Sequence, residues 1–369
     1  MEITVMAKSI LILWMMSSLI WQVVGVGRIE RVPGMFIFGD SLGDAGTNNF
    51  IPNCTARADF SPYGVSSFLS PTGRFTNGLT VFDFIAKYLE LPLIPPYREL
   101  TFKPLYLQQG IYSYGANFAS GGSGLLDSTG LDKKVVKLSD QISKFEEFSE
   151  CVPKKSYLGN SLYCISSGGN DIEAYFSNYS NALTPPYTPF VNSLVSTHEG
   201  YIQRLHRAGA RKFLILDISA VGCTPSARLK YNSTYNGGCA ELGNQVAQEY
   251  NTAMKKLVDD LNGELEDVNI IILNSYDHLE TMFYNGEDFG FSETESACCG
   301  SGPLRANVSC GQTTPTDQYC DYPDTHLFWD TIHPTEKVYS IFSEKIWGGN
   351  SSFMHPFNLS TLVFGMNKK

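Results

Sequence analysis

The stretch from Met35 to Thr47 constrains the fold more than any other part of the chain. A short apolar run, Met-Phe-Ile-Phe, is followed at once by Gly39, Asp40 and Ser41. A continuous apolar run is typical of a parallel strand buried on both faces, and ligands of open α/β sheets lie beyond the carboxyl ends of such strands. Ser41 therefore stands where a nucleophile would lie, although Gly, Asp and Ser are also the ordinary residues of a β-turn.

A base for Ser41 must come from elsewhere in the chain, because a serine hydroxyl is a weak nucleophile until a positioned group takes its proton. His333 directly precedes Pro334 and follows Asp330 by three residues. A residue before proline is pushed out of the helical region, so the pattern predicts a loop that leads into a helix. There Asp330 can orient the imidazole of His333, in the chain order Ser, Asp, His. The alternative is that Asp330 only caps that helix.

Four sequence blocks together resemble the GDSL esterase/lipase family of the SGNH hydrolase superfamily. They occur in the family's order, they span residues 36–335, and the segment 73–78 resembles the plant branch. The blocks are Gly-Asp-Ser-Leu at 39–42, a glycine block at 115–124, Gly-Gly-Asn-Asp at 168–171 and Asp-Thr-Ile-His-Pro-Thr at 330–335.

This resemblance implies an ester hydrolase with Ser41, Asp330 and His333 as its catalytic residues and with no cofactor or metal ion. Acyl transfer develops negative charge on the carbonyl oxygen, so hydrogen-bond donors must point to that atom. The resemblance assigns this role to the amide of Ser41, to an amide of the glycine block and to the side chain of Asn170. Counting from Asn117 favours Gly122 for the second donor. Taken alone, the segment around Asn170 also reads as a turn.

The rest of the chain alternates short apolar runs with amphipathic stretches. Strands are predicted at 111–119, 161–167, 211–219 and 268–274, and helices at 192–208 and 240–261. Strands that alternate with helices predict a parallel sheet covered on both faces. The resemblance implies the same α/β class, a three-layer α/β/α fold with a mostly parallel five-stranded sheet in flavodoxin-like order.

The N-terminus has the pattern of a secretory signal peptide, with Lys8, an apolar segment at 10–24 and small residues at Gly25 and Gly27. We therefore expect residues 1–27 to be removed and 28–369 to form a single domain. The net charge of −10 argues against nucleic acid as a partner. No later segment is apolar and long enough to span a membrane.

Sequons and cysteines support an extracellular location, in the cell wall or apoplast. An oxidising compartment favours disulfides over a metal site for the cysteines between 298 and 320. The nine cysteines leave at least one free thiol, for which Cys164 in a buried run is the best candidate. N-linked glycans are expected at the six Asn-x-Ser/Thr sites, which are Asn53, Asn178, Asn232, Asn307, Asn350 and Asn358.

The mechanism expected for this set of residues is two-step acyl transfer through an acyl-enzyme on Ser41, resolved by water. The same groups would support an acyltransferase if an acceptor hydroxyl replaced water, and a non-catalytic binding protein on this fold is a further alternative. Short and medium acyl esters are favoured over insoluble triacylglycerols, since the blocks around Ser41 are polar and rich in glycine. Acetylated wall polysaccharides are the first candidate substrate and acyl lipids the second.

Overall fold

Five short runs form the parallel strands of one sheet in the computed structural model, which describes residues 32–98, 114–152, 154–177, 186–231, 238–311 and 319–365. The strand order is β2-β1-β3-β4-β5, the flavodoxin-like order expected from the sequence. β8 (Met354–His355) adds a sixth, antiparallel strand beside β5, so the predicted count of five holds only for the parallel part. The parallel strands are β1 (Met35–Gly39), β2 (Gly115–Asn117), β3 (Leu162–Ser166), β4 (Lys212–Leu216) and β5 (Asn269–Leu273).

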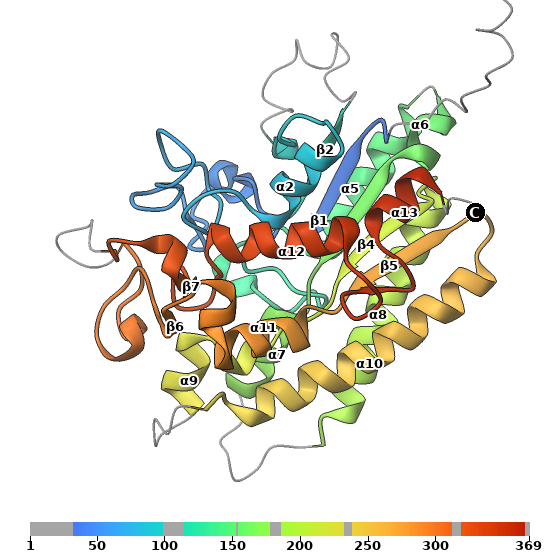
Figure 1. The fold of residues 1–369 in the computed structure, drawn as a ribbon. Coiled ribbons are helices and arrows are strands. Elements are labelled where there is room, and N and C mark those ends of the chain that lie inside the picture. Colours follow the sequence, from blue (N-terminus) through green and yellow to red (C-terminus); the bar gives the residue numbers. More distant parts are fainter. Residues whose placement is uncertain are drawn as a thin grey trace, which may run out of the picture. The chain divides into compact units, whose positions relative to one another are not determined.

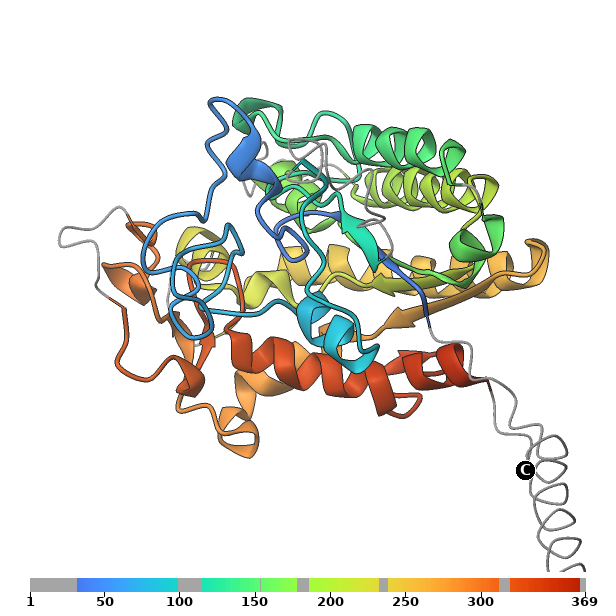
Figure 2. The same cartoon turned by 90° about the horizontal axis from the view of Figure 1, so that it is seen from above.

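The sheet is apolar on both faces because helices cover both of them, which confirms the predicted three-layer α/β/α class (Figures 1 and 2). Every residue of β1 and β3 is buried. Phe36 of β1 packs on Tyr163 and Phe145, with ring centroids 5.2 and 5.0 Å away. Such burial of whole strands explains why the runs are continuous rather than alternating.

The two helical layers are seen on either side of the sheet in Figure 2. One layer contains α5 (Leu138–Glu150), α8 (Thr188–Arg207) and α10 (Glu241–Glu264), and the other contains α2 (Val81–Tyr88), α12 (Glu336–Gly348) and α13 (Leu359–Phe364). The helices predicted at 192–208 and 240–261 correspond to α8 and α10. The remaining helices are α6 (Lys155–Asn160), α7 (Gly169–Ser177), α9 (Pro225–Tyr231) and α11 (Ser275–Tyr284), with short 3₁₀ turns that include η3 (Leu131–Lys133) and η4 (Val221–Cys223).

A small second sheet was not predicted from the sequence. β6 (Glu293–Ala297) pairs in parallel with β7 (His326–Phe328), and the pairing places the segment that carries Asp330 and His333 directly after β7. Only part of β6 is buried, so it lacks the continuous apolar run by which the main strands were found. β7 is only three residues long.

Six of the nine cysteines form disulfides, the bonding that an oxidising compartment favours. The pairs are Cys223–Cys239, Cys298–Cys320 and Cys299–Cys310, so the cluster that also raised the possibility of a metal site is joined by two bridges. Cys164 is buried and unpaired, which confirms the prediction made for it, and Cys54 and Cys151 are free as well.

Several sequence predictions fall on residues outside the described part. These are the signal peptide at 1–27, the sequons Asn178 and Asn232, and the first residues of the strand predicted at 111–119. Residues from 32 onward form one compact unit, and in its described ranges no helix is both long and apolar enough to cross a membrane.

Candidate active site

The loop after β1 places Ser41 at the carboxyl edge of the sheet. Gly39 ends β1 with a φ of +125°, and a Cβ at this position would collide with the carbonyl oxygen of Ser166 on β3. Glycine therefore lets the two strands pair up to the residue where the loop starts. The carbonyl oxygen of Asp40 accepts the amide of Asp44 over 3.1 Å, which closes the turn around Ser41.

The loop after β7 brings an imidazole to this hydroxyl. The Oγ of Ser41 and the Nε2 of His333 are 2.7 Å apart, and the Nδ1 of His333 lies 2.9 and 2.8 Å from the two carboxylate oxygens of Asp330. The loop holds its shape because the Oδ1 of Asp330 also accepts the backbone amides of Ile332 and His333. The three predicted side chains thus form one continuous chain of hydrogen bonds. α12 begins after Thr335, so Asp330 does not cap it.

Two residues of the loop between β1 and α2 complete this arrangement, and no sequence pattern pointed to the first of them. The hydroxyl of Tyr63 donates to the Oδ2 of Asp330 over 2.7 Å, and the ring of Phe75 packs 5.1 Å from that of His333. Tyr63 is buried against Trp329. Tyr63 thus bonds to the carboxylate oxygen that accepts none of the backbone amides. Phe75 belongs to the segment 73–78 that resembled the plant branch.

The carboxylate of Asp330 stays ionised although it is buried. Burial by itself raises the pKa of Asp330, but the charge of His333 and the hydrogen bonds from its ring and backbone outweigh this effect and hold the pKa below its usual value. An ionised carboxylate beside Nδ1 favours the tautomer that leaves Nε2 free to accept a proton.

The amides that could stabilise an oxyanion differ from their neighbours in having no internal partner. Among the described residues, neither the amide of Ser41 nor that of Gly122 donates a hydrogen bond, whereas the amide of Gly121 donates to the Oδ2 of Asp44 over 2.8 Å. An unpaired amide is free to bind a ligand oxygen. This difference favours Gly122 over Gly121, the register that counting from the glycine block had suggested.

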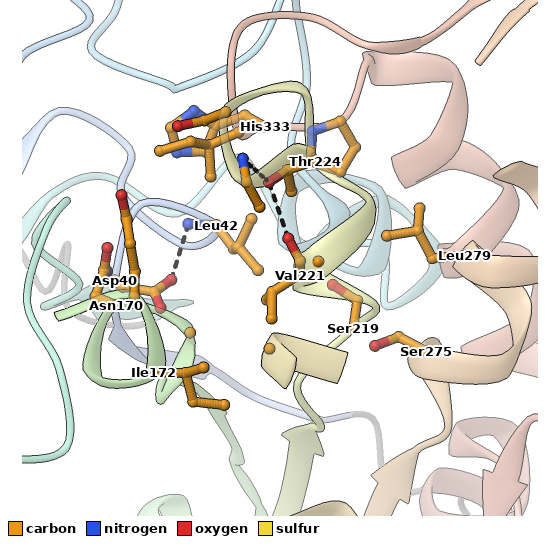
Figure 3. Close-up of a pocket in the computed structure, with 18 of the residues that line it drawn as sticks. Asp40, Leu42, Asn170, Ile172, Ser219, Val221, Thr224, Ser275, Leu279 and His333 are labelled. Carbon is orange, nitrogen blue, oxygen red and sulfur yellow. Dashed lines mark hydrogen bonds between the residues drawn. The ribbon is translucent and has the colours of Figure 1, made fainter. Parts of the chain in front are cut away.

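The side chain of Asn170 projects from the first turn of α7. Its Nδ2 donates to the carbonyl oxygen of Ser123 over 2.9 Å, so the amide is oriented by the glycine block and keeps a second N–H. Figure 3 shows Asn170 beside Asp40 on the wall of the cavity that Ser41 also lines. Gly122 is not among the residues of that wall, and its α-carbon faces Lys133 and other residues behind it.

Two buried aspartates hold the glycine block in place. Asp44 accepts the amides of Gly46 and Thr47 with one oxygen and that of Gly121 with the other. Asp171 accepts two amides at positions 125 and 126 and the hydroxyl of Thr129. Asp40, which directly precedes Ser41, also bonds to the turn backbone, because its Oδ1 accepts the amide of Leu42.

A cavity of about 210 Å³ opens beside Ser41 and His333. Figure 3 shows it bounded by Ile172 on one side and by Leu279 on the other, with Val221 between them. Its wall is mostly apolar, which the polar blocks around Ser41 had not suggested. Because α11, α12 and the ends of β4 and β5 supply this wall, residues that are far apart in the chain create it.

Three buried aspartates at this edge of the sheet make stability depend on pH. Burial raises the pKa of Asp40 and of Asp217 to about 7 and that of Asp44 to about 6, from an ordinary 3.8. Between about pH 4 and these values each holds a proton in the folded chain that the unfolded chain has lost. Their stabilisation is therefore present at low pH and is lost as the pH rises through the folded-state pKa. His198 acts in the opposite direction, because burial lowers its pKa to about 4.

We expect the free energy of unfolding to fall between pH 5 and pH 8, and Asp217→Asn to remove roughly 2 to 3 kcal/mol of that fall. In the wild type the backbone amide of Ser275 donates to the Oδ1 of Asp217 over 2.7 Å. The side-chain oxygen of asparagine can still accept this hydrogen bond. Urea unfolding at pH 5, 6, 7 and 8 checks this, with Asp288→Asn at an exposed position as the control. Parallel pH curves for the wild type and Asp217→Asn would contradict the prediction.

Comparison with known proteins identifies relatives along nearly the whole chain. The family described as GDSL-like Lipase/Acylhydrolase matches residues 35–346. The chain is 36% identical to GDSL esterase/lipase 6 of Arabidopsis thaliana, over 94% of each protein, and 33% identical to GDSL esterase/lipase 7 of the same plant, over 96% of this chain and 99% of that protein. It is 32% identical to a GDSL lipase of Tanacetum cinerariifolium, over 91% of this chain and 89% of that protein.

Proposed function

This chain belongs to the GDSL-like lipase/acylhydrolase family of ester hydrolases, and we propose that it is a secreted serine esterase that uses Ser41, His333 and Asp330. The observation that carries the proposal is the unbroken hydrogen-bond chain from the Oγ of Ser41 through both ring nitrogens of His333 to a buried carboxylate. A nucleophile, a base and an orienting acid in this order are what acyl transfer requires.

In the proposed reaction the Nε2 of His333 accepts the proton of Ser41 as its Oγ attacks the ester carbonyl. The resulting oxyanion receives hydrogen bonds from the free amides of Ser41 and Gly122 and from the second N–H of Asn170. His333 then donates its proton to the leaving alcohol, which yields the acyl-enzyme. Water, deprotonated by the same imidazole, attacks the acyl-enzyme; the bond between the acyl carbon and Oγ then breaks, His333 returns the proton to Oγ, and the acid is released. Asp330 stabilises the imidazolium in both steps.

Secretion is supported by the predicted signal peptide and by three disulfides. We propose glycans at the exposed sequons Asn53, Asn307 and Asn350, and at Asn178 and Asn232. Asn358 is less accessible, because its Oδ1 caps α13 and its Nδ2 donates to a backbone carbonyl. We propose Asn358 as the sixth site, with the lowest occupancy of the six.

The proposed substrates are carboxylic esters of short and medium acyl chains. The decisive test is a panel of p-nitrophenyl esters from acetate to palmitate, with a fluorophosphonate probe that labels reactive serines. Hydrolysis together with labelling at Ser41, located by peptide mass mapping, is the expected result. An inactive protein that takes up no label would remove the proposed function.

Asn170→Ala should lower kcat roughly 10²-fold to 10³-fold while KM changes little. The oxyanion carries its full charge only near the transition state, so a donor aimed at it contributes to turnover more than to substrate binding. Kinetics on p-nitrophenyl acetate, with the melting temperature as the control for folding, checks this. A raised KM at unchanged kcat would make Asn170 a binding residue instead.

A further inference from the structure

The cavity beside Ser41 is lined by charged residues at its mouth and by apolar residues further in. At its mouth lie the exposed charged residues Glu173, Lys230 and Glu241, whereas its inner wall is apolar. The inner residues, which we call the acyl chamber, are each no more than 6% exposed and come from α7, β4, β5, α11 and α12. They are Ile172, Leu216, Leu273, Leu279 and Phe342.

Two of the buried polar residues in the inner wall, Asp217 and Ser275, bond to each other, whereas the buried hydroxyl of Tyr339 has no hydrogen-bond partner among the described residues. The Oδ1 of Asp217 accepts both the amide and the hydroxyl of Ser275, so this carboxyl anchors the start of α11. Apart from the Tyr339 hydroxyl, this wall therefore offers a ligand mainly apolar contact. The charged mouth and the apolar interior together fit a substrate with an apolar acyl chain and a polar alcohol.

From this gradient we infer that the acyl chamber binds the acyl chain of the substrate and limits it to about eight to twelve carbons, an inference that rests on the proposed function. A cavity of about 150 Å³ holds the six carbons of benzene, so 210 Å³ holds about eight. The whole cavity, from Ser41 after β1 to Leu273 at the end of β5, crosses three strand spacings, which is roughly 14 Å. An extended chain covers about 3.4 Å with every three bonds, so this distance corresponds to about twelve bonds.

Leu279 and Phe342 are the residues that we assign to set the chain length. Leu279 is 2% exposed on α11 and projects into the cavity from the side opposite Asp40 (Figure 3). Leu279→Trp fills the chamber with an indole, and Phe342→Ala lengthens it. A Trp at position 279 would overpack a closed core, but the chamber leaves room for it.

The test measures kcat/KM for p-nitrophenyl acetate, octanoate, decanoate and palmitate. For the wild type we expect a rise of about tenfold or more from acetate to octanoate or decanoate, and a fall at palmitate. Leu279→Trp should lower the ratio of decanoate to acetate at least tenfold, and Phe342→Ala should move the optimum towards palmitate. Thr281→Trp, which adds the same indole on the exposed side of α11, should leave the profile unchanged.

Failure of the chamber and failure of the proposed function give different results. If acetate is hydrolysed but the profile is flat, or if Leu279→Trp leaves the ratio unchanged, the chamber does not hold the acyl chain and the esterase stands. Binding of decanoic acid to Ser41→Ala, measured by calorimetry, does not depend on catalysis. Binding that Leu279→Trp weakens tenfold or more in this background supports the chamber, and absence of binding overturns it.

Discussion

Ser41→Ala should abolish ester hydrolysis, with a fall in kcat of roughly 10⁴-fold to 10⁶-fold. The hydroxyl of Ser41 has one hydrogen-bond partner, the Nε2 of His333, and its side chain is only partly buried. Removing it therefore deletes the nucleophile and little else, so the free energy of unfolding should change by no more than about 1 kcal/mol. Initial rates on p-nitrophenyl acetate and a urea unfolding curve measure the two effects.

The matched control for this variant is Ser167→Ala, which makes the same substitution one strand away. Ser167 follows β3 directly, much as Ser41 follows the end of β1, and its buried hydroxyl has no hydrogen-bond partner in the described part of the chain. It should keep the wild-type rate and should not lose stability. A folded Ser41→Ala protein that still hydrolyses the ester at the wild-type rate would show that Ser41 is not the nucleophile.

The sequence contained most of what was needed to predict the sheet. β1, β3, β4 and β5 are continuous apolar runs because helices bury both faces, and each was predicted to within one to three residues at either end. The loops that follow such strands are the natural place for ligands. The positions of Ser41 and Asn170 at one edge of the sheet therefore followed from local pattern.

Tyr63 and the cavity wall could not be predicted in the same way. Tyr63 reaches Asp330 across 267 positions of the chain, and nothing in its local sequence distinguishes it from other buried tyrosines. The apolar wall joins Ile172, Leu216 and Leu279, each of which is an ordinary core residue in its own element. Properties of this kind arise from packing between elements. The sequence pattern within one element does not reveal such packing. The apolar cavity was therefore not predicted from the sequence, and the preference for short and medium acyl esters stays a prediction.

The second large effect is expected from Asp330→Asn, which should lower kcat roughly 10⁴-fold with the protein still folded. Asparagine has nearly the same shape as aspartate, so its oxygen can still accept the amides of Ile332 and His333. Its NH₂ group then faces the Nδ1 of His333 and the hydroxyl of Tyr63, where the carboxylate had accepted from both. An NH₂ donor makes Nδ1 an acceptor and moves the imidazole proton to Nε2, which can then no longer accept the proton of Ser41.

Asp324→Asn is the control, because it removes an exposed carboxylate from the turn that precedes β7. Its rate on p-nitrophenyl acetate should stay within about twofold of the wild type, as is usual for a surface change away from the site. The melting temperature separates the two explanations for a loss of rate in Asp330→Asn. If that protein melted like the wild type and kept its rate, His333 would act without an acid. If its rate fell only because the protein unfolded, the role of the carboxylate would be to stabilise the loop and not to set the tautomer of His333. Asp330 orients His333 and stabilises the imidazolium only if Asp330→Asn is folded and slow.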